Sequence, residues 1–126
     1  MSSKTKTHGA FGEDYTVKYL KKHGYKVVER NYHSRFGEID IIAIKKTVIA
    51  LVEVKTRTEG SLYSPREAVN YFKQQKCVKT AQIYLMENHT ELQPRFDVSE
   101  IVIKKGLNER TEVKLHNYIE NAFSLG

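Results

Sequence analysis

Hydrophobic residues recur with helical spacing near the start of the chain. They stand seven and three residues apart within residues 10–23 and are Ala10, Val17 and Leu20. This spacing places them on one face of a helix, and Glu13 shares that face. The pattern predicts a helix over residues 10–23 whose buried side also carries a carboxylate.

Three strands are predicted after this helix. Gly24 commonly marks a helix end because glycine adopts the left-handed conformation without strain. Residues 26–32 are rich in β-forming side chains, and two strongly apolar runs follow at residues 37–44 and 48–56. Residues 45–47 between these runs are too few for anything but a tight turn, so the two runs form a hairpin.

A second helix is predicted from a capping signal. Ser64 and Glu67 have capping-box spacing, and Pro65 stands at the first helical position, so a long helix begins there and runs towards Glu87. Its apolar residues surround the axis instead of forming one stripe, which indicates a helix that bends or packs on two sides. They include Val69, Phe72, Cys77, Ala81, Tyr84 and Leu85.

The remaining residues complete a mixed sheet. Pro94 closes a loop, residues 96–103 form a fourth strand, and residues 105–108 form a turn. For residues 112–123 the periodicity leaves two alternatives open, a further strand and a strand with a short terminal helix. The predicted fold class is α/β, a mixed β-sheet flanked by helices in the order helix, three strands, helix, strand.

The hairpin register predicts which side chains meet. If the turn is centred between Lys46 and Thr47, the numbers of opposed residues sum to 93, and side chains alternate between the two faces of each strand. One face then carries the pairs Glu38 with Lys55, Asp40 with Glu53 and Ile42 with Leu51. The other face is wholly apolar and carries Ile39 with Val54, Ile41 with Val52 and Ala43 with Ala50.

Two opposed carboxylates, Asp40 and Glu53, are unfavourable on a half-buried sheet. At roughly 5 Å and an effective dielectric near 20 they repel by about 3 kcal/mol, whereas ordinary cross-strand pairs contribute about 0.2 to 1 kcal/mol. A proton or a cation between them relieves the repulsion. Carboxylates, water and a backbone carbonyl, here that of Val54, are the ligands that Mg²⁺ prefers, with Mn²⁺ as a substitute.

These groups suit phosphodiester hydrolysis. A divalent metal activates water and neutralises charge at the phosphate. Lys55, on the same face as Glu53, is placed to stabilise developing charge or to orient the attacking water. Glu13 is a candidate to hold a second metal or to orient a metal-bound water.

A structural interpretation competes with the catalytic one. Glu38 and Lys55 alone would form a plain cross-strand salt bridge, with Asp40 and Glu53 on a solvated face. The loose motif of Asp, spacer and Glu-x-Lys also occurs a second time, as Asp97, Glu112 and Lys114. The first copy differs because it is embedded in near-continuous apolar runs, which are typical of central strands.

Composition adds a preference for polyanionic partners. The 126 residues suit one compact domain, which we place at residues 9–126 after a basic tail at residues 1–8, and 21 Lys and Arg exceed 15 Asp and Glu. Cys77 is the only cysteine, and the five histidines lack metal-ligand spacing, so neither a disulfide nor a zinc cage is expected. The tail resembles neither a signal peptide nor a membrane anchor, and we expect a cytoplasmic protein.

The motifs together resemble the YraN family of uncharacterised predicted endonucleases. They stand in the segments 37–40 (GEID), 53–57 (EVKTR) and 95–97 (RFD), and the resemblance covers residues 9–123. That family is similar to archaeal Holliday junction resolvases and to the wider restriction-endonuclease-like superfamily. Many superfamily members carry proline where this chain has Ile39.

The resemblance implies roles for particular residues. Asp40 and Glu53 would be metal ligands, Lys55 the catalytic lysine and Glu13 the acidic residue of the first helix. Asp97 would be a secondary site residue or a structural partner of Arg95.

The expected activity is that of a metal-dependent DNA endonuclease or of an enzyme that processes branched or junction DNA, acting as a homodimer where the substrate is two-fold symmetric. The alternative is a non-catalytic nucleic-acid-binding or assembly module that keeps the fold. Candidate phosphate contacts are basic residues near the second helix, with ordinary solvated side chains as the other interpretation. They are Arg57, Arg66, Lys73, Lys76 and Lys79.

Overall fold

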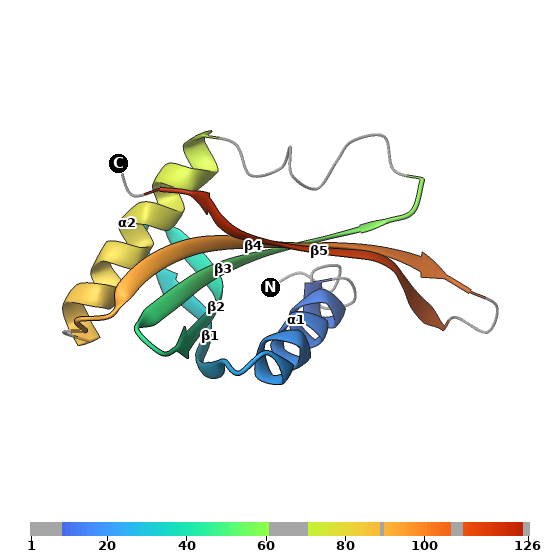
Figure 1. Ribbon diagram of the computed structural model, residues 1–126. Helices are drawn as coiled ribbons and strands as arrows, with labels where there is room; N and C mark the ends of the chain where they lie inside the picture. The colour runs from blue at the N-terminus through green and yellow to red at the C-terminus, as the bar shows by residue number, and fades with distance from the viewer. Residues whose placement is uncertain (1–8, 61–70, 89, 107–109, 125–126) are drawn as a thin grey trace.

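The computed structural model describes residues 9–60, 71–88, 90–106 and 110–124, which form two helices and one five-stranded sheet (Figure 1). In chain order the elements are α1 (Ala10–Lys22), β1 (Lys26–Ser34), β2 (Gly37–Lys45), β3 (Val48–Thr58), α2 (Tyr71–Asn88), β4 (Gln93–Lys105) and β5 (Thr111–Phe123). The strands lie in sequence order across the sheet, and only β3 and β4 are parallel. Because parallel neighbours need a crossover, α2 connects them. The predicted mixed α/β fold is confirmed.

The first helix ends where the glycine signal places its end. Gly24 has φ +90°, and its N–H donates to the carbonyl of Lys21. Val17 and Leu20 are buried as predicted, whereas Ala10 is exposed because it is the first residue of the helix. Gly12 and Thr16 complete the buried face.

The hairpin turn has the predicted centre. Lys45 pairs with Val48, and Lys46 between them has φ +54°, as two-residue hairpin turns require. The register that follows is the predicted one as far as the pair Ile41 and Val52. Beyond that pair the two strands separate, which shapes the candidate site described below.

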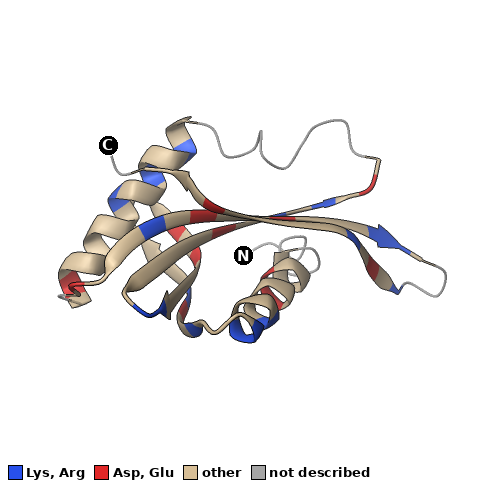
Figure 2. Cartoon of the chain, in the orientation of Figure 1, with Lys and Arg blue, Asp and Glu red and all other residues tan. Residues whose placement is uncertain are grey.

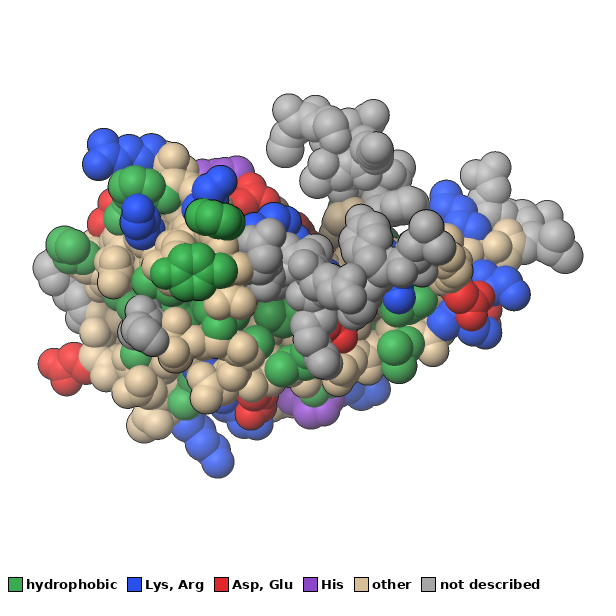
Figure 3. Space-filling view, turned by 90° about the horizontal axis from the view of Figure 1, so that it is seen from above, with side chains coloured by type: hydrophobic (Ala, Val, Ile, Leu, Met, Phe, Trp, Pro, Cys, Tyr) green, Lys and Arg blue, Asp and Glu red, His purple; other side chains and the backbone are tan. Residues whose placement is uncertain are grey.

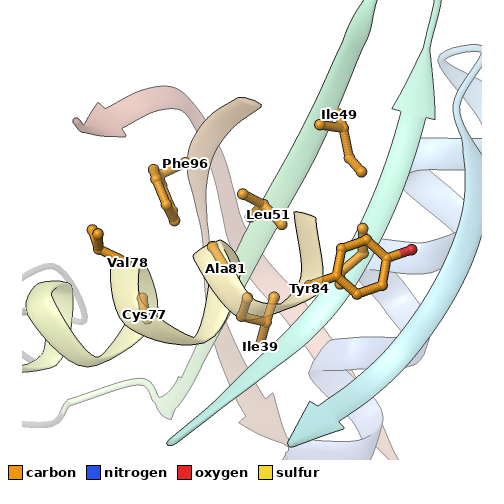
Figure 4. Packing of buried hydrophobic residues seen from close by; sticks show 9 residues of the cluster. Ile39, Ile49, Leu51, Cys77, Val78, Ala81, Tyr84 and Phe96 are labelled. Carbon is orange, nitrogen blue, oxygen red and sulfur yellow. The ribbon is translucent and has the colours of Figure 1, made fainter. Parts of the chain in front are cut away.

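Alternate residues of this hairpin point to opposite faces of the sheet and pack in two separate hydrophobic cores. Ile42 and Leu51 pack with α2, whereas Ile41 and Val52 pack with α1 on the other face of the sheet. Figure 4 shows the α2 core, in which the side chains of the sheet and the helix point toward one another. Its labelled members are Ile39, Ile49, Leu51, Cys77, Val78, Ala81, Tyr84 and Phe96. The central strands are therefore packed between two helices, one on each face of the sheet.

Three predictions concern the second half of the chain. The capping signal at Ser64 to Glu67 lies outside the described residues. Within α2 the residues that pack on the sheet form one side, and Phe72 is 75% exposed, so the helix does not bury apolar residues all round. The last segment is a strand through Phe123, without the alternative terminal helix.

Neither of the helices in the described part of the chain combines the length and apolar character needed to cross a membrane.

Candidate active site

The candidate site lies where β2 separates from β3. A two-residue turn makes Lys45 and Val48 a hydrogen-bonded pair, and every second pair along the ladder is then also hydrogen-bonded, so Val54 would next bond to the backbone of β2. Instead the Val54 N–H donates to Oδ2 of Asp40 at 2.8 Å. The Asp40 side chain thus takes the place of a ladder hydrogen bond, and the strands part at this point.

The separation corrects one prediction about the faces. Ile39 was expected beside Ile41 on the apolar face that α1 covers, but it packs in the α2 core with Ile42. Its neighbours Ile41 and Val52 remain on the α1 face. Strict alternation fails at Asp40 because β2 no longer follows the ladder of β3 there.

Asp40 and Glu53 lie in one pocket, although not as a backbone-paired couple. The backbone pairing of β2 and β3 ends one pair before them, so their predicted direct opposition is not formed. Asp40 is 7% exposed. Burial, and next the negative charge of Glu53, raise the pKa of Asp40 well above its ordinary value, while the Val54 hydrogen bond acts in the opposite direction. The predicted electrostatic conflict between these two carboxylates is therefore present.

Lys55 pairs with Glu53 and not with Glu38. Its Nζ lies 3.2 Å from Oε2 of Glu53, and both side chains are 17% exposed. Glu38 instead lies 3.3 Å from Nδ1 of His33. Among the described residues the cross-strand salt bridge of the structural interpretation is thus replaced by a pair along β3.

The charge state of Lys55 follows from this contact. Burial is the largest single influence and lowers the pKa of Lys55, but Glu53, Lys73 and Asp40 together outweigh it, so the net shift is upward. Lys73 of α2 hydrogen bonds to Lys55, and this contact together with burial lowers the pKa of Lys73. The Lys55 ammonium is therefore held in the pocket, next to a lysine that gives up its proton more readily than usual.

Glu13 reaches the same pocket from α1. Asn31 donates to its Oε1 at 3.2 Å, and Arg30 lies 3.5 Å from the same oxygen. Asn31 has φ +54°, a conformation that asparagine adopts more readily than most residues. Burial raises the pKa of Glu13 despite these partners. Glu13 therefore reaches the same pocket as Asp40 and Glu53, and its role there stays a prediction.

A cavity of about 460 Å³ joins these groups. It lies between the start of α1, the diverging strands and the start of α2. Its lining residues are Gly9, Glu13, Gly37, Glu38, Asp40, Glu53, Val54, Lys55, Lys73, Lys76 and Cys77. The four predicted catalytic residues and the predicted carbonyl donor therefore share one cavity.

Lys79 is not among the residues that line the cavity, and the other four basic candidates divide into three groups. Lys73 and Lys76 line the cavity, and Figure 2 shows basic positions recurring along α2. Arg57 lies further along β3, opposite Val102, and is not among the lining residues. Arg66 lies outside the described residues.

The donor set fits magnesium only in part. Among the described residues, no three His, Cys, Asp or Glu side chains are grouped closely enough to hold a metal. Mg²⁺ is usually bound by one or two carboxylates with waters and substrate phosphate, so Asp40 and Glu53 meet this need. In a strand the N–H and C=O of one residue point to the same neighbour, so the Val54 carbonyl faces the gap beside Asp40.

One contact in the cavity has no counterpart in the predictions. Cys77 Sγ lies 3.7 Å from Oε1 of Glu53, and burial raises the pKa of the thiol to about 12, with Glu53 as the next cause. A neutral thiol therefore covers one oxygen of Glu53 while Lys55 covers the other. The available signal was the spacing of Lys73 and Cys77, four residues apart and thus on one helix face.

The second copy of the motif is not a site. Asp97 is fully buried, and its carboxylate accepts hydrogen bonds from Arg95, from the Tyr118 hydroxyl at 2.6 Å and from the Asn121 N–H. Glu112 pairs in the ladder with Lys104, and Lys114 lies 3.9 Å from Glu112. Asp97 contacts Tyr118, which lies several positions along β5 from Glu112 and Lys114. The three motif residues are therefore not brought together. Asp97 is a structural partner of Arg95, one of the two predicted roles.

Comparison with known proteins agrees with the fold and the motifs. Residues 12–101 match the model of the Uncharacterised protein family UPF0102. The chain belongs to the UPF0102 family. A UPF0102 protein of Caldanaerobacter subterraneus subsp. tengcongensis is 45% identical over 119 residues, 94% of this chain and 95% of that protein. One of Clostridium botulinum strain 657 is 45% identical over 120 residues, 93% of this chain and 94% of that protein.

Membership in UPF0102 confirms the family that the motifs resemble. The family description gives no activity, metal or substrate. A functional conclusion for this UPF0102 protein therefore rests on the residues of its cavity.

Proposed function

We propose that this UPF0102 protein is a metal-dependent nuclease that hydrolyses phosphodiester bonds of DNA. The observation that carries the proposal is the buried carboxylate of Asp40 beside Glu53 and Lys55 in one cavity. A buried carboxylate with a raised pKa destabilises the folded protein at neutral pH, and such groups gather at functional sites.

Each residue of the cavity has a defined task. Asp40 and Glu53 present carboxylate oxygens, with the Val54 carbonyl beside them, as ligands for Mg²⁺ or Mn²⁺. The metal, when bound, activates water and neutralises charge on the phosphate. Lys55 places a positive charge beside Glu53, where it stabilises the charge that develops on the phosphate. Glu13 is held by Asn31 and Arg30 at the rim and orients a water.

Branched or junction DNA is the substrate class suggested by the resemblance to resolvases. Cleavage of both strands of a two-fold symmetric junction requires two copies of a chain with one such cavity, so we propose a homodimer on that substrate. Size-exclusion chromatography with and without junction DNA tests this part.

A second candidate function follows from the pair of Glu53 with Lys55. Both Glu53 oxygens have protein neighbours, Lys55 and Cys77, so this carboxylate has partners without a metal. A non-catalytic nucleic-acid-binding module would keep this arrangement and bind through its basic residues. Salt-dependent binding without metal-dependent cleavage would favour it.

The experiment that separates the two is a cleavage assay on branched, nicked and single-stranded DNA with Mg²⁺ or Mn²⁺. We expect wild-type protein to cut at least one substrate, and Asp40→Ala and Glu53→Ala to lose that activity. Glu112→Ala is the matched control, because Glu112 stands in the second copy of the motif. No metal-dependent cleavage by wild-type protein on any substrate would contradict the nuclease proposal.

A further inference from the structure

A second cationic feature lies outside the catalytic groups, at the turn between β1 and β2. The Arg35 guanidinium lies 5.0 Å from the centre of the Phe36 ring, and the Lys79 ammonium lies 5.2 Å from the same centre. Arg35 comes from the turn and Lys79 from α2, so one aromatic ring holds cations from two elements. These three residues are named here the Phe36 clamp.

The turn that carries the clamp is firmly docked on α2. The hydroxyls of Ser34 and Thr80 are hydrogen bonded at 2.8 Å, and the Phe36 N–H donates to the Ser34 hydroxyl at 3.0 Å. At Gly37, an added Cβ would lie 3.6 Å from Cβ of Lys76, so backbone and helix nearly touch. Arg35 and Phe36 are therefore positioned before any ligand arrives.

The charges of the clamp are not neutralised within the described residues. Both side chains are exposed, and neither Arg35 nor Lys79 forms an ion pair with a carboxylate there. Both cations lie near one ring, so they place two positive charges on the same part of the surface. An anion bound here would neutralise these positive charges, just as a cation would neutralise the carboxylate pair in the cavity.

The clamp continues the cavity along α2. Lys76 lines the cavity, and Lys79 follows it three residues later, on the same side of the helix. From Lys73 to Lys79 the helix rises about 9 Å, the axial length of two to three phosphates of one B-form strand. Figure 3 shows basic side chains projecting beside hydrophobic ones over the part of the molecule that contains α2.

We propose that the Phe36 clamp binds a backbone phosphate of the DNA strand, two to three nucleotides from the bond cut in the cavity. This inference rests on the proposed function, since it assigns the clamp to the same substrate. It fixes the direction in which the strand leaves the centre, along α2 toward the turn between β1 and β2. A phosphate contact positions the strand without reading its sequence.

Salt-dependent binding tests the clamp directly. Fluorescence anisotropy with a labelled DNA duplex, without divalent metal, gives the affinity at several NaCl concentrations. Each lost phosphate contact lowers the slope of log affinity against log salt by about 0.9 and the affinity at 0.1 M salt by roughly eightfold. We expect a slope lower by about 0.9 for the double variant Arg35→Ala with Lys79→Ala, because the two cations hold one phosphate together.

A matched control removes two exposed cations from elsewhere. Lys18→Ala with Lys22→Ala, on α1, changes the net charge by the same amount and is expected to leave the slope near the wild-type value. Phe36→Leu keeps both charges but removes the ring, so we expect a smaller loss of affinity with the slope retained. Circular dichroism melting curves confirm that each variant is folded.

The two proposals fail in different ways. If wild-type protein binds and cuts DNA while the clamp variant matches the Lys18 and Lys22 control in slope and affinity, the clamp is overturned and the nuclease proposal stands. If wild-type protein shows no salt-dependent binding to DNA, the clamp is overturned, and the cleavage assay with Mg²⁺ or Mn²⁺ decides the nuclease proposal by itself. A selective loss of slope in the clamp variant supports the clamp even if no cleavage is detected.

Discussion

Replacing Asp40 by asparagine separates the function of this residue from its effect on folding. The amide oxygen of asparagine can still accept the Val54 hydrogen bond that Asp40 Oδ2 accepts at 2.8 Å. The substitution removes the buried negative charge beside Glu53. We expect Asp40→Asn to abolish cleavage and, in metal-free buffer, to make the protein more stable at neutral pH.

The direction of this change in stability follows from proton linkage. Because the pKa of Asp40 is raised in the folded state, the folded protein holds this proton more tightly than the unfolded chain, whose pKa is near 3.8. Wild-type stability therefore decreases as pH rises above about 3.8 and through the raised folded pKa. Asparagine does not titrate, so the advantage of Asp40→Asn is absent at low pH and grows across that window.

The repulsion from Glu53 gives a lower limit for the effect, because burial is the larger cause of the raised pKa of Asp40. Two full charges at roughly 5 Å and an effective dielectric near 20 repel by about 3 kcal/mol. Lys55, 3.2 Å from Glu53, offsets part of this repulsion, and each unit of pKa shift corresponds to about 1.4 kcal/mol. We expect the free energy of unfolding of Asp40→Asn to exceed that of wild type by at least ~2 kcal/mol at pH 7.

Urea unfolding with a chelator at several pH values measures this difference. Asp97→Asn is the matched control, because it makes the same change at a buried aspartate whose charge is paired with Arg95. Breaking that pair should lower stability by about 3 kcal/mol. Equal destabilisation by both substitutions, or a wild-type pH dependence unchanged in Asp40→Asn, would refute the reasoning.

Three further outcomes are expected. Mg²⁺ should raise the thermal midpoint of wild-type protein but not that of Asp40→Asn, measured by differential scanning fluorimetry, because only the wild type gains a folded-state ligand. Gly12→Ala should destabilise the protein by about 1–3 kcal/mol in urea unfolding, since the added Cβ would lie 1.9 Å from Oγ1 of Thr56. With its pKa raised to about 12, Cys77 should resist iodoacetamide at pH 8 in the folded protein and react once urea unfolds it.

The hairpin was predictable because its determinants are local. A two-residue turn and alternating apolar residues specify the register from Lys45 and Val48 as far as Ile41 and Val52. That register ends at Asp40, because the Asp40 side chain accepts the Val54 hydrogen bond that a backbone carbonyl would otherwise accept. Hydrophobic periodicity cannot predict a side chain that competes with the backbone for a hydrogen bond. The prediction therefore located the carboxylates but misplaced Ile39.

The other missed features depend on contacts between distant segments. Lys55 was expected opposite Glu38, but the strands part before that pair, and Glu53 on the same strand becomes its partner. The network around Asp97 joins β4 to β5 and to Tyr25 through Arg95. Spacing along one strand cannot reveal partners that only the folded sheet brings together.

Cleavage rates of wild-type and Lys55→Ala proteins test the central claim most directly. On a DNA substrate that the wild type cuts, with saturating Mg²⁺, we expect Lys55→Ala to be slower by at least about 100-fold. Lys114→Ala, the same change in the second copy of the motif, should cut at the wild-type rate. Equal rates for wild type and Lys55→Ala, or cleavage that persists without divalent metal, would contradict a metal-dependent centre built from Asp40, Glu53 and Lys55.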